Sequence, residues 1–164
     1  MAKWIVNGDL DKYMSRLQKL GKETEQKVVG KALYDAGAIV ADQIKQNIGM
    51  IPQDDRYIPK GSTTRGIPGK AIEGLKDSLG ITKMLQDRHY VYNIKVGFDG
   101  YNGNVTKRWP QGAPNQLVAR AVEKGTSWLI ATPFNKKALA VATKPAQEAM
   151  QKAVEDGIKN IMEE

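Results

Sequence analysis

The sequence predicts an α+β fold, in which helices pack against a small antiparallel β-sheet. Three observations predict it: a long helical repeat of apolar residues over 23–47, a second helical repeat over 145–162, and a strict apolar alternation over 89–98. The chain has 164 residues, of which 41% are hydrophobic and 26% are charged. We therefore expect a single domain, 1–164.

The first third of the chain is expected to be helical. Asn7-Gly8-Asp9 is typical of a turn, and a short amphipathic helix should follow it and end at Gly21. Its apolar residues are three and four positions apart: Leu10, Tyr13, Met14, Leu17 and Leu20. The longer helix, 23–47, has one apolar stripe formed by Val29, Leu33, Ala36, Val40 and Ile44.

The middle of the chain predicts a long loop followed by the sheet. Residues 49–69 are rich in Pro and Gly and have no apolar period, which indicates a long flexible loop. A short helix over 72–79 should come next. The strands 81–85 and 89–98 are then expected to pair across the turn 86–88.

The second half of the chain begins with another loop. Residues 99–114, rich in Gly and Asn, indicate a second long flexible loop, and a helix over 117–122 should end at Gly125. A helical stretch is expected to begin at Pro133. Because proline lacks the amide that a helix interior needs, we expect Pro145 to interrupt that stretch and to start the last helix, 145–162.

Positive charge is concentrated in the centre of the chain. Residues 56–144 contain 15 Lys and Arg against 5 Asp and Glu, a net of +10, and the flanks contain 10 against 13, a net of −3, which gives the overall +7. Such a stretch favours polyanionic partners, although a solvated surface is the commoner explanation. With no cysteine there is no disulfide or thiolate metal site. Neither a secretory leader nor a membrane-spanning segment is predicted.

No motif in the sequence predicts catalysis. His89 is the single histidine and falls in the alternating strand, where a structural or exposed role is favoured. Gly61 and Gly66 have phosphate-loop spacing, but Ile67 stands where that motif needs lysine. Asp54-Asp55 is interpreted as a solvated turn, because it lacks the alternating spacing of calcium ligands. We expect no enzyme, no catalytic residue, no cofactor and no metal.

Two groups of residues are candidates for interaction. Basic residues in the two loops could contact DNA or an acidic neighbour through backbone phosphates or carboxylates, without base recognition: Arg65, Lys70, Lys107 and Arg108, beside Trp109. Trp128-Leu129-Ile130 follows a Gly-Thr-Ser turn and either fills the core of the domain or forms a patch that another chain covers. Its spacing does not distinguish these alternatives.

Four motifs, taken in order, resemble the tail-completion or head-to-tail joining proteins of long-tailed double-stranded DNA bacteriophages and prophages. The start Ile5-Val6-Asn7-Gly8-Asp9-Leu10 is one of them. The other three are Gly74-Leu75-Lys76-Asp77-Ser78-Leu79, the segment Val122-Glu123-Lys124-Gly125-Thr126-Ser127, and Thr132-Pro133-Phe134. The resemblance covers nearly the whole chain. The sequence departs from the family pattern at Glu73, at Trp128-Leu129-Ile130 and at Pro145.

The resemblance implies a structural virion protein, assembled in the cytoplasm of a bacterial host. Such a protein forms a homo-oligomeric ring, here expected to be a hexamer, and docks on portal, adaptor or tail rings around a DNA-containing lumen. The residues assigned to the family motifs or to structure are Gly74, Leu75, Ser78, Glu123, Gly125, Thr126, Ser127, Pro133 and Phe134. The interface is expected at Trp128, Leu129 and Ile130.

Two alternatives stay open. One is a monomeric module that binds nucleic acid without sequence preference, using the basic loops. The other, weaker one is an enzyme that depends on His89.

Overall fold

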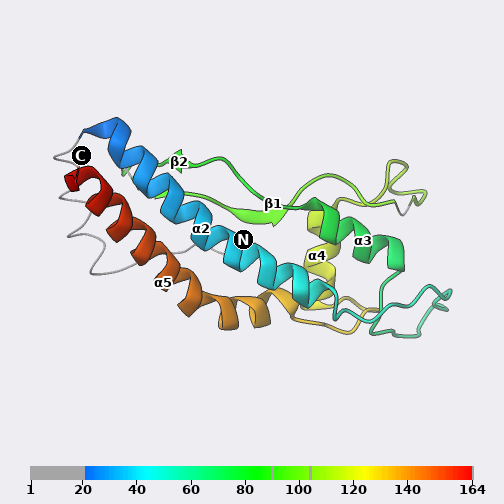
Figure 1. The fold of residues 1–164 in the computed structure, drawn as a ribbon. Coiled ribbons are helices and arrows are strands. Elements are labelled where there is room, and N and C mark those ends of the chain that lie inside the picture. Colours follow the sequence, from blue (N-terminus) through cyan, green and yellow to red (C-terminus); the bar gives the residue numbers. More distant parts are fainter. Residues whose placement is uncertain (1–20, 90, 104, 164) are drawn as a thin grey trace. The chain divides into compact units, whose positions relative to one another are not determined.

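The computed structural model describes residues 21–89, 91–103 and 105–163 and has an α+β fold (Figure 1). The predicted helix over 10–20 lies outside the described residues. The elements, in chain order, are α2 Lys22–Ile48, α3 Gly69–Ser78, β1 Leu79–Ile81, β2 Leu85–Gln86, β3 Tyr92–Asn93, β4 Val96–Phe98, α4 Asn115–Lys124 and α5 Phe134–Glu163. The predicted helices over 23–47, 72–79 and 117–122 are thereby confirmed within a few residues.

The chain divides into two compact units, each assembled from separate stretches. The first unit holds Met1–Val40, Ile81–Val96 and Ala142–Glu164, and the second holds Ala41–Gly80 and Gly97–Val141. Both α2 and α5 contribute residues to each unit. The expectation of a single domain stays a prediction.

In the first unit, α2 and the C-terminal part of α5 run in opposite directions and pack through small side chains (Figure 1). Alanines and valines dominate their buried faces: Val28, Val29, Ala32, Ala36 and Val40 from α2, and Ala142, Ala146, Met150, Ala153, Val154 and Ile158 from α5. Gly157 allows this close approach, because a Cβ there would lie 2.7 Å from Cγ1 of Val28. Three residues of the predicted apolar stripe, Val29, Ala36 and Val40, therefore lie on the packing face of α2.

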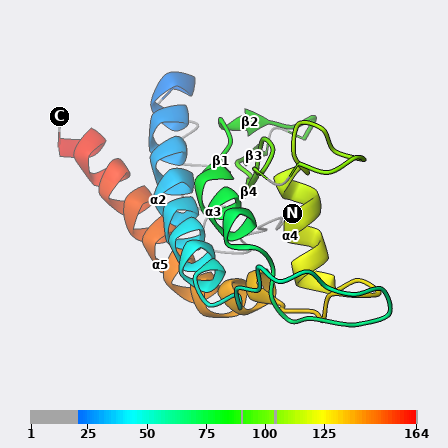
Figure 2. The same ribbon diagram turned by 90° about the vertical axis from the view of Figure 1, so that its right-hand side faces the viewer.

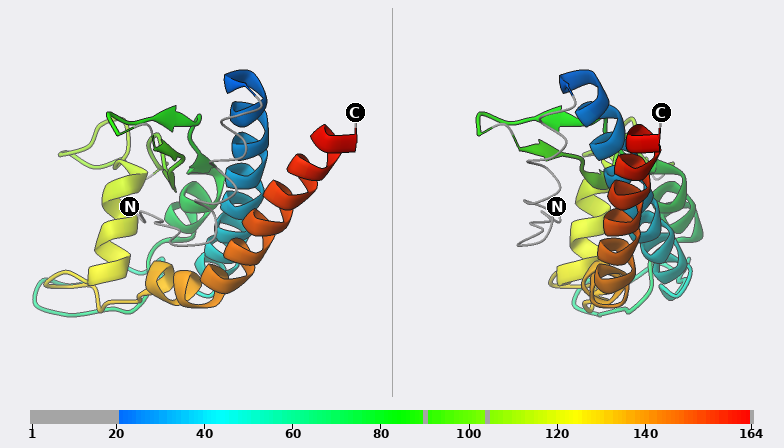
Figure 3. Two further views of the ribbon diagram at one scale, coloured as in Figure 1. Left: turned by 90° about the vertical axis from the view of Figure 1, so that its left-hand side faces the viewer. Right: turned by 60° about the vertical axis from the view of Figure 1, so that its left-hand side comes forward.

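The first unit also contains an antiparallel hairpin (Figure 3). Strand β2 pairs with β3 in the register Leu85↔Asn93 and Gln86↔Tyr92. The loop between the strands is closed by Asp87, whose amide donates to the carbonyl of Val91. The predicted turn at 86–88 began one residue early and was too short, since Gln86 lies in β2 and β3 begins at Tyr92.

The predicted strand over 89–98 is two short strands, so the expected single sheet is two pairs, β1 with β4 and β2 with β3. The ladder changes at Lys95, whose amide donates to Oγ1 of Thr82 instead of a backbone carbonyl. Between the strands, Ile94 packs on α2 at Gly37, where a Cβ would lie 2.6 Å from the Ile94 Cδ1. The chain between β3 and β4 therefore packs on α2 through Ile94 and does not continue as one regular strand.

In the second unit, α3 packs against α4, and the loop 49–68 runs beside residues 125–133 (Figure 2). Its core gathers apolar side chains from helices and loops alike: Ile48, Ile51, Ile67, Ala71, Ile72, Leu75, Ala119, Val122, Leu129, Phe134 and Ala138. Both predicted loops are present, and isolated β-bridges pair residues within them. The first loop therefore has a defined path.

The expected interruption at Pro145 was wrong, because Pro145 lies inside α5. A proline at this position cannot donate a hydrogen bond to the carbonyl of Val141. Val141 and Pro145 are both exposed, whereas Ala142 and Ala146 are buried. Water can therefore bind the unused carbonyl, and packing of the opposite face stabilises the helix through the proline. Among the described residues, no helix combines the length and the apolar character needed to cross a membrane.

Gly157→Ala should lower the free energy of unfolding by about 1–3 kcal/mol, because the new methyl group would overlap the stiff, buried Val28. Gly30→Ala is the matched control in α2: a Cβ there would lie 3.7 Å from two atoms of the flexible Met84, so the variant should gain about 0.5–1 kcal/mol of helix propensity. Urea denaturation measures both changes. A stabilised Gly157→Ala protein would contradict the packing described for this helix pair.

Candidate functional site

Residues 123–130 form a turn that presents two large apolar side chains, and its first half is shaped by the motif residues. The carboxylate of Glu123 accepts hydrogen bonds from the amides of Asn135 at 2.8 Å and Lys136 at 3.0 Å, which caps the start of α5. Gly125 ends α4 with φ of 76°, in the region that favours glycine, and its amide donates to the carbonyl of Ala121.

Thr126 closes the second half of the turn. Its amide donates to the carbonyl of Leu129 at 2.8 Å, and its Oγ1 accepts the Leu129 amide at 3.0 Å. Ser127 is exposed within the turn. The predicted Gly-Thr-Ser turn therefore has a specific hydrogen-bonded geometry.

The segment Trp128-Leu129-Ile130 alternates between surface and core. Trp128 is 46% exposed and Ile130 is 40% exposed, whereas Leu129 is only 3% exposed. The sequence left open whether this segment fills the core or forms a patch, and in the structure it contributes to both. We call the exposed pair Trp128 and Ile130 the apolar pair.

Thr64 of the first loop holds this segment in place. Its amide donates to the carbonyl of Trp128 at 2.8 Å, and its carbonyl accepts the amide of Ile130 at 2.8 Å. These two bonds form an isolated parallel bridge between Thr64 and Leu129. The apolar pair is consequently presented on backbone with a defined path.

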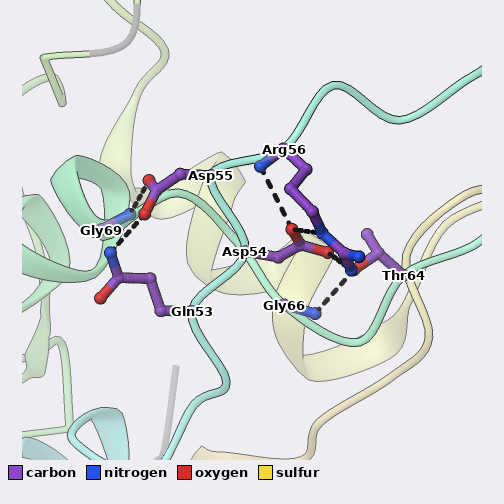
Figure 4. Close-up of polar contacts among 7 residues, drawn as sticks. All are labelled: Gln53, Asp54, Asp55, Arg56, Thr64, Gly66 and Gly69. Atoms are coloured by element: carbon purple, nitrogen blue, oxygen red, sulfur yellow. Dashed lines mark hydrogen bonds and ion pairs between the residues drawn. The ribbon is translucent and has the colours of Figure 1, made fainter.

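The side chain of Thr64 connects this bridge to Asp54 (Figure 4). Its Oγ1 donates to Oδ2 of Asp54 at 2.8 Å and accepts the amide of Gly66 at 3.1 Å. Arg56 donates from Nε to Oδ1 of Asp54 at 2.9 Å and from Nη2 to Oδ2 at 3.0 Å. The hydrogen bonds from Arg56 and Thr64 hold the pKa of Asp54 well below its ordinary value.

Asp54 is therefore not solvated, which corrects half of the interpretation from sequence, whereas Asp55 is exposed as that interpretation expected. The side chain of Asp54 is only 9% exposed. Asp55 accepts the side-chain amide of Gln53 and the backbone amide of Gly69 at the start of α3, and both bonds lower its pKa. Both carboxylates are occupied by groups of the chain itself. Among the residues that the structure describes, no cluster of His, Cys, Asp or Glu could hold a metal ion.

The remaining motif residues lie in the core or beside it. Phe134 is buried, with its ring 6.1 Å from that of Phe98 in an edge-to-face contact. The carbonyl of Phe134 accepts Nδ2 of Asn47 at 3.0 Å, and Pro133 before it is half-buried. Leu75 is fully buried in α3. These residues position the turn and leave the apolar pair as its exposed part.

Ser78, at the end of α3, accepts the amide of Asp99 through its carbonyl at 3.0 Å, next to the β1–β4 pair. Gly74 faces two asparagines that the sequence analysis did not single out. A Cβ at Gly74 would lie 2.9 Å from Cβ of Asn102 and 3.1 Å from Oδ1 of Asn115. Asparagine is ordinary in a Gly-rich loop, so composition could not have identified this pair.

The candidate basic residues are exposed but differ in their surroundings. Arg65 follows Thr64 in the first loop, and Lys107 and Arg108 lie in the second, where the Arg108 guanidinium is 5.7 Å from the Trp109 ring centroid. Lys70 lies in α3 at the edge of a groove that Glu73, Asp77 and Asp99 also line. His89 is exposed in the hairpin loop, where its amide donates to Asp87.

Comparison of the chain with protein-family models, with curated proteins and with solved structures found no match in any of the three.

Asp54→Asn should remove a pH dependence that the wild-type protein has. Because the pKa of Asp54 is lowered in the folded state, its ionised form stabilises that state above about pH 4, the ordinary pKa of aspartate. This contribution is lost as the pH falls from there toward the lowered pKa. Urea midpoints between pH 7 and pH 2 should therefore fall more steeply for wild type than for Asp54→Asn.

The exposed Asp42→Asn serves as the control and should follow the wild-type curve. Parallel curves for wild type and Asp54→Asn would show that the Asp54 contacts do not contribute to folding.

Proposed function

We propose that the protein is a structural component of a phage or prophage neck, which assembles into a homo-oligomeric ring and docks on neighbouring portal, adaptor or tail rings. The observation that carries this proposal is the apolar pair. Trp128 and Ile130 stand side by side in one segment, both substantially exposed, while Leu129 between them is buried. Tryptophan is among the residue types that contribute most to protein interfaces, above all where it lies near the centre of the contact.

The way the apolar pair is presented also supports an interface. Thr64 forms hydrogen bonds with the carbonyl of Trp128 and the amide of Ile130, and Thr126 closes the turn before them. A surface that is already ordered loses little conformational entropy on association. One of the short motifs that resemble neck proteins, Val122-Glu123-Lys124-Gly125-Thr126-Ser127, contributes the first half of this turn. A second, Thr132-Pro133-Phe134, follows the turn, and the amide of Thr132 donates to the carbonyl of Val122 at 2.7 Å.

The double variant Trp128→Ser with Ile130→Ser should weaken self-association. Loss of a central interface residue costs about 2 kcal/mol, so the dissociation constant should rise about thirtyfold. Analytical ultracentrifugation over a concentration series gives the mass, and negative-stain electron microscopy shows whether rings form.

The matched control is Leu117→Gln with Val141→Gln, which removes two exposed apolar side chains from helices and should leave association unchanged. A wild-type protein that stays monomeric at every concentration, and also in mixtures with neck and tail components, would overturn the proposal. Equal effects of the two double variants would place the interface elsewhere.

A second candidate function is sequence-independent binding of nucleic acid by the second loop. It is favoured by the exposed Lys107 and Arg108, with the Arg108 guanidinium beside the Trp109 ring. Such a cluster supplies charge for phosphates and a ring on which a base can stack. In a neck ring the same residues would face DNA in the lumen.

Lys107→Glu with Arg108→Glu should weaken duplex binding and reduce its salt dependence. Each phosphate contact contributes about −0.9 to the slope of log K against log salt, so loss of two contacts should reduce the slope by about 2. Fluorescence anisotropy of a labelled duplex measures both values. Lys136→Glu with Lys137→Glu, an exposed pair with the same charge change, should leave the slope unaltered. An unchanged slope in the loop variant would exclude this loop as the contact.

A further inference from the structure

The second unit contains a groove, which we call the α3 groove, formed by one face of α3, the start of the loop 99–114 and the first residue of α4. Its polar lining includes Lys70, Glu73, Asp77, Asp99 and Asn115, and Tyr101 is also part of it. Three carboxylates and one ammonium group thus line it. The groove is acidic within a protein whose net charge is +7.

The concentration of acid in the groove stands out against the rest of this part of the chain. Residues 56–144 contain 15 Lys and Arg but only 5 Asp and Glu. Two of these five have local structural tasks, since Glu123 caps α5 and Asp87 binds amides of the hairpin loop. The other three are the carboxylates of the α3 groove. Three of the five acidic residues of the central stretch therefore line this one groove.

Two of these carboxylates have no partner among the described residues. Glu73 and Asp77 lie four positions apart on the same face of α3, both are exposed, and neither forms a hydrogen bond or an ion pair within the part of the chain that the structure describes. The third, Asp99, accepts the amide of Gly100 through Oδ1.

The floor of the groove holds a buried acceptor without a donor. Asn115 is 2% exposed, and its Oδ1 has no hydrogen-bond partner among the described residues. Its orientation is set by Nδ2, which donates to the carbonyl of Asp99 at 3.0 Å, and by its amide, which donates to the carbonyl of Gly100. The Oδ1 therefore lies against Gly74, which also lines the groove, and a Cβ at position 74 would come within 3.1 Å of it. A buried carbonyl without a donor is costly, and a ligand that supplies one recovers that cost.

From these features we infer that the α3 groove binds the guanidinium group of an arginine presented by a partner protein. Such a groove favours a cation with several donors, because its three carboxylates outnumber the one ammonium of Lys70 and the Oδ1 of Asn115 lacks a donor. A guanidinium has five N–H donors in one plane, whereas an ammonium has three. The exposed ring of Tyr101 adds a face on which a guanidinium stacks. A metal ion is not a candidate, since the described residues contain no cluster that could hold one.

The inference does not depend on the proposed neck function. If the protein is monomeric and its groove binds arginine, the proposal of a ring is wrong and the inference about the groove stands. If the protein forms rings and its groove does not bind arginine, the inference is wrong and the proposal of a ring stands.

The test is a titration of ¹⁵N-labelled protein with a short Gly-Ser peptide that carries one arginine, at low salt. Saturable shifts are expected in the amides of 70–78, 99–103 and 115. The same peptide with citrulline, a neutral isostere, should produce no saturable shift, and the lysine peptide should bind more weakly. Equal binding of the three peptides, shifts that map elsewhere, or no saturation with arginine would overturn the inference.

The variant for this test is Glu73→Gln with Asp77→Asn, which removes two exposed charges and leaves the core untouched. Its dissociation constant for the arginine peptide should be about fivefold higher. Asp42→Asn with Asp156→Asn, two exposed acids on other helices with the same charge change, should bind as wild type does. Equal affinity of wild type and the groove variant would overturn the inference.

The mass in solution of the variant Glu73→Gln with Asp77→Asn, measured by analytical ultracentrifugation, identifies the source of the arginine. Weaker peptide binding together with weaker self-association assigns the arginine to a second copy of this chain. Weaker peptide binding with unchanged self-association assigns it to a different protein. Both results support recognition of a guanidinium by the groove.

Discussion

The second unit depends on the contacts of one residue, Thr64. Its backbone amide and carbonyl bind the segment that carries the apolar pair, while its hydroxyl bonds Asp54 and the amide of Gly66. Thr64 is itself 8% exposed, so these bonds are largely shielded from water. Asp54 then extends the network, because its amide donates to the carbonyl of Ile67 at 3.0 Å. A loop rich in Pro and Gly, with few apolar residues to bury, acquires its conformation from this chain of polar contacts.

Sequence periodicity predicted the helices well, because each has one apolar face and those faces are what the core buries. The same rule failed where a local pattern and the tertiary structure differ. Tyr92, Ile94, Val96 and Phe98 alternate as one strand would, yet the ladder changes at Lys95, where a threonine hydroxyl takes the place of a backbone carbonyl. At Pro145 the predicted interruption took into account the hydrogen bond that proline cannot donate. It did not take into account that water can bind the free carbonyl on the exposed face of α5.

One part of the candidate site could likewise be predicted from the sequence and another part could not. The turn at Gly125 and Thr126 could be predicted, because glycine with positive φ and a threonine hydroxyl that binds nearby amides are local effects. The bridge from Thr64 to Leu129 joins residues far apart in the chain, and nothing in either loop specifies the other. The α3 groove was missed for the same reason. Its carboxylates come from α3 and the next loop, and its asparagine from the start of α4, so they meet only when the unit is folded.

The alternation of Trp128, Leu129 and Ile130 restricts how this part of the protein can evolve. Because Leu129 must point inward while the residues on either side point outward, inserting or deleting one position after Thr126 would exchange buried and exposed side chains along the segment. Its length is therefore constrained, but the chemical nature of positions 128 and 130 is not. Point substitutions at these two surface positions would therefore alter the exposed surface while the backbone beneath keeps the same path.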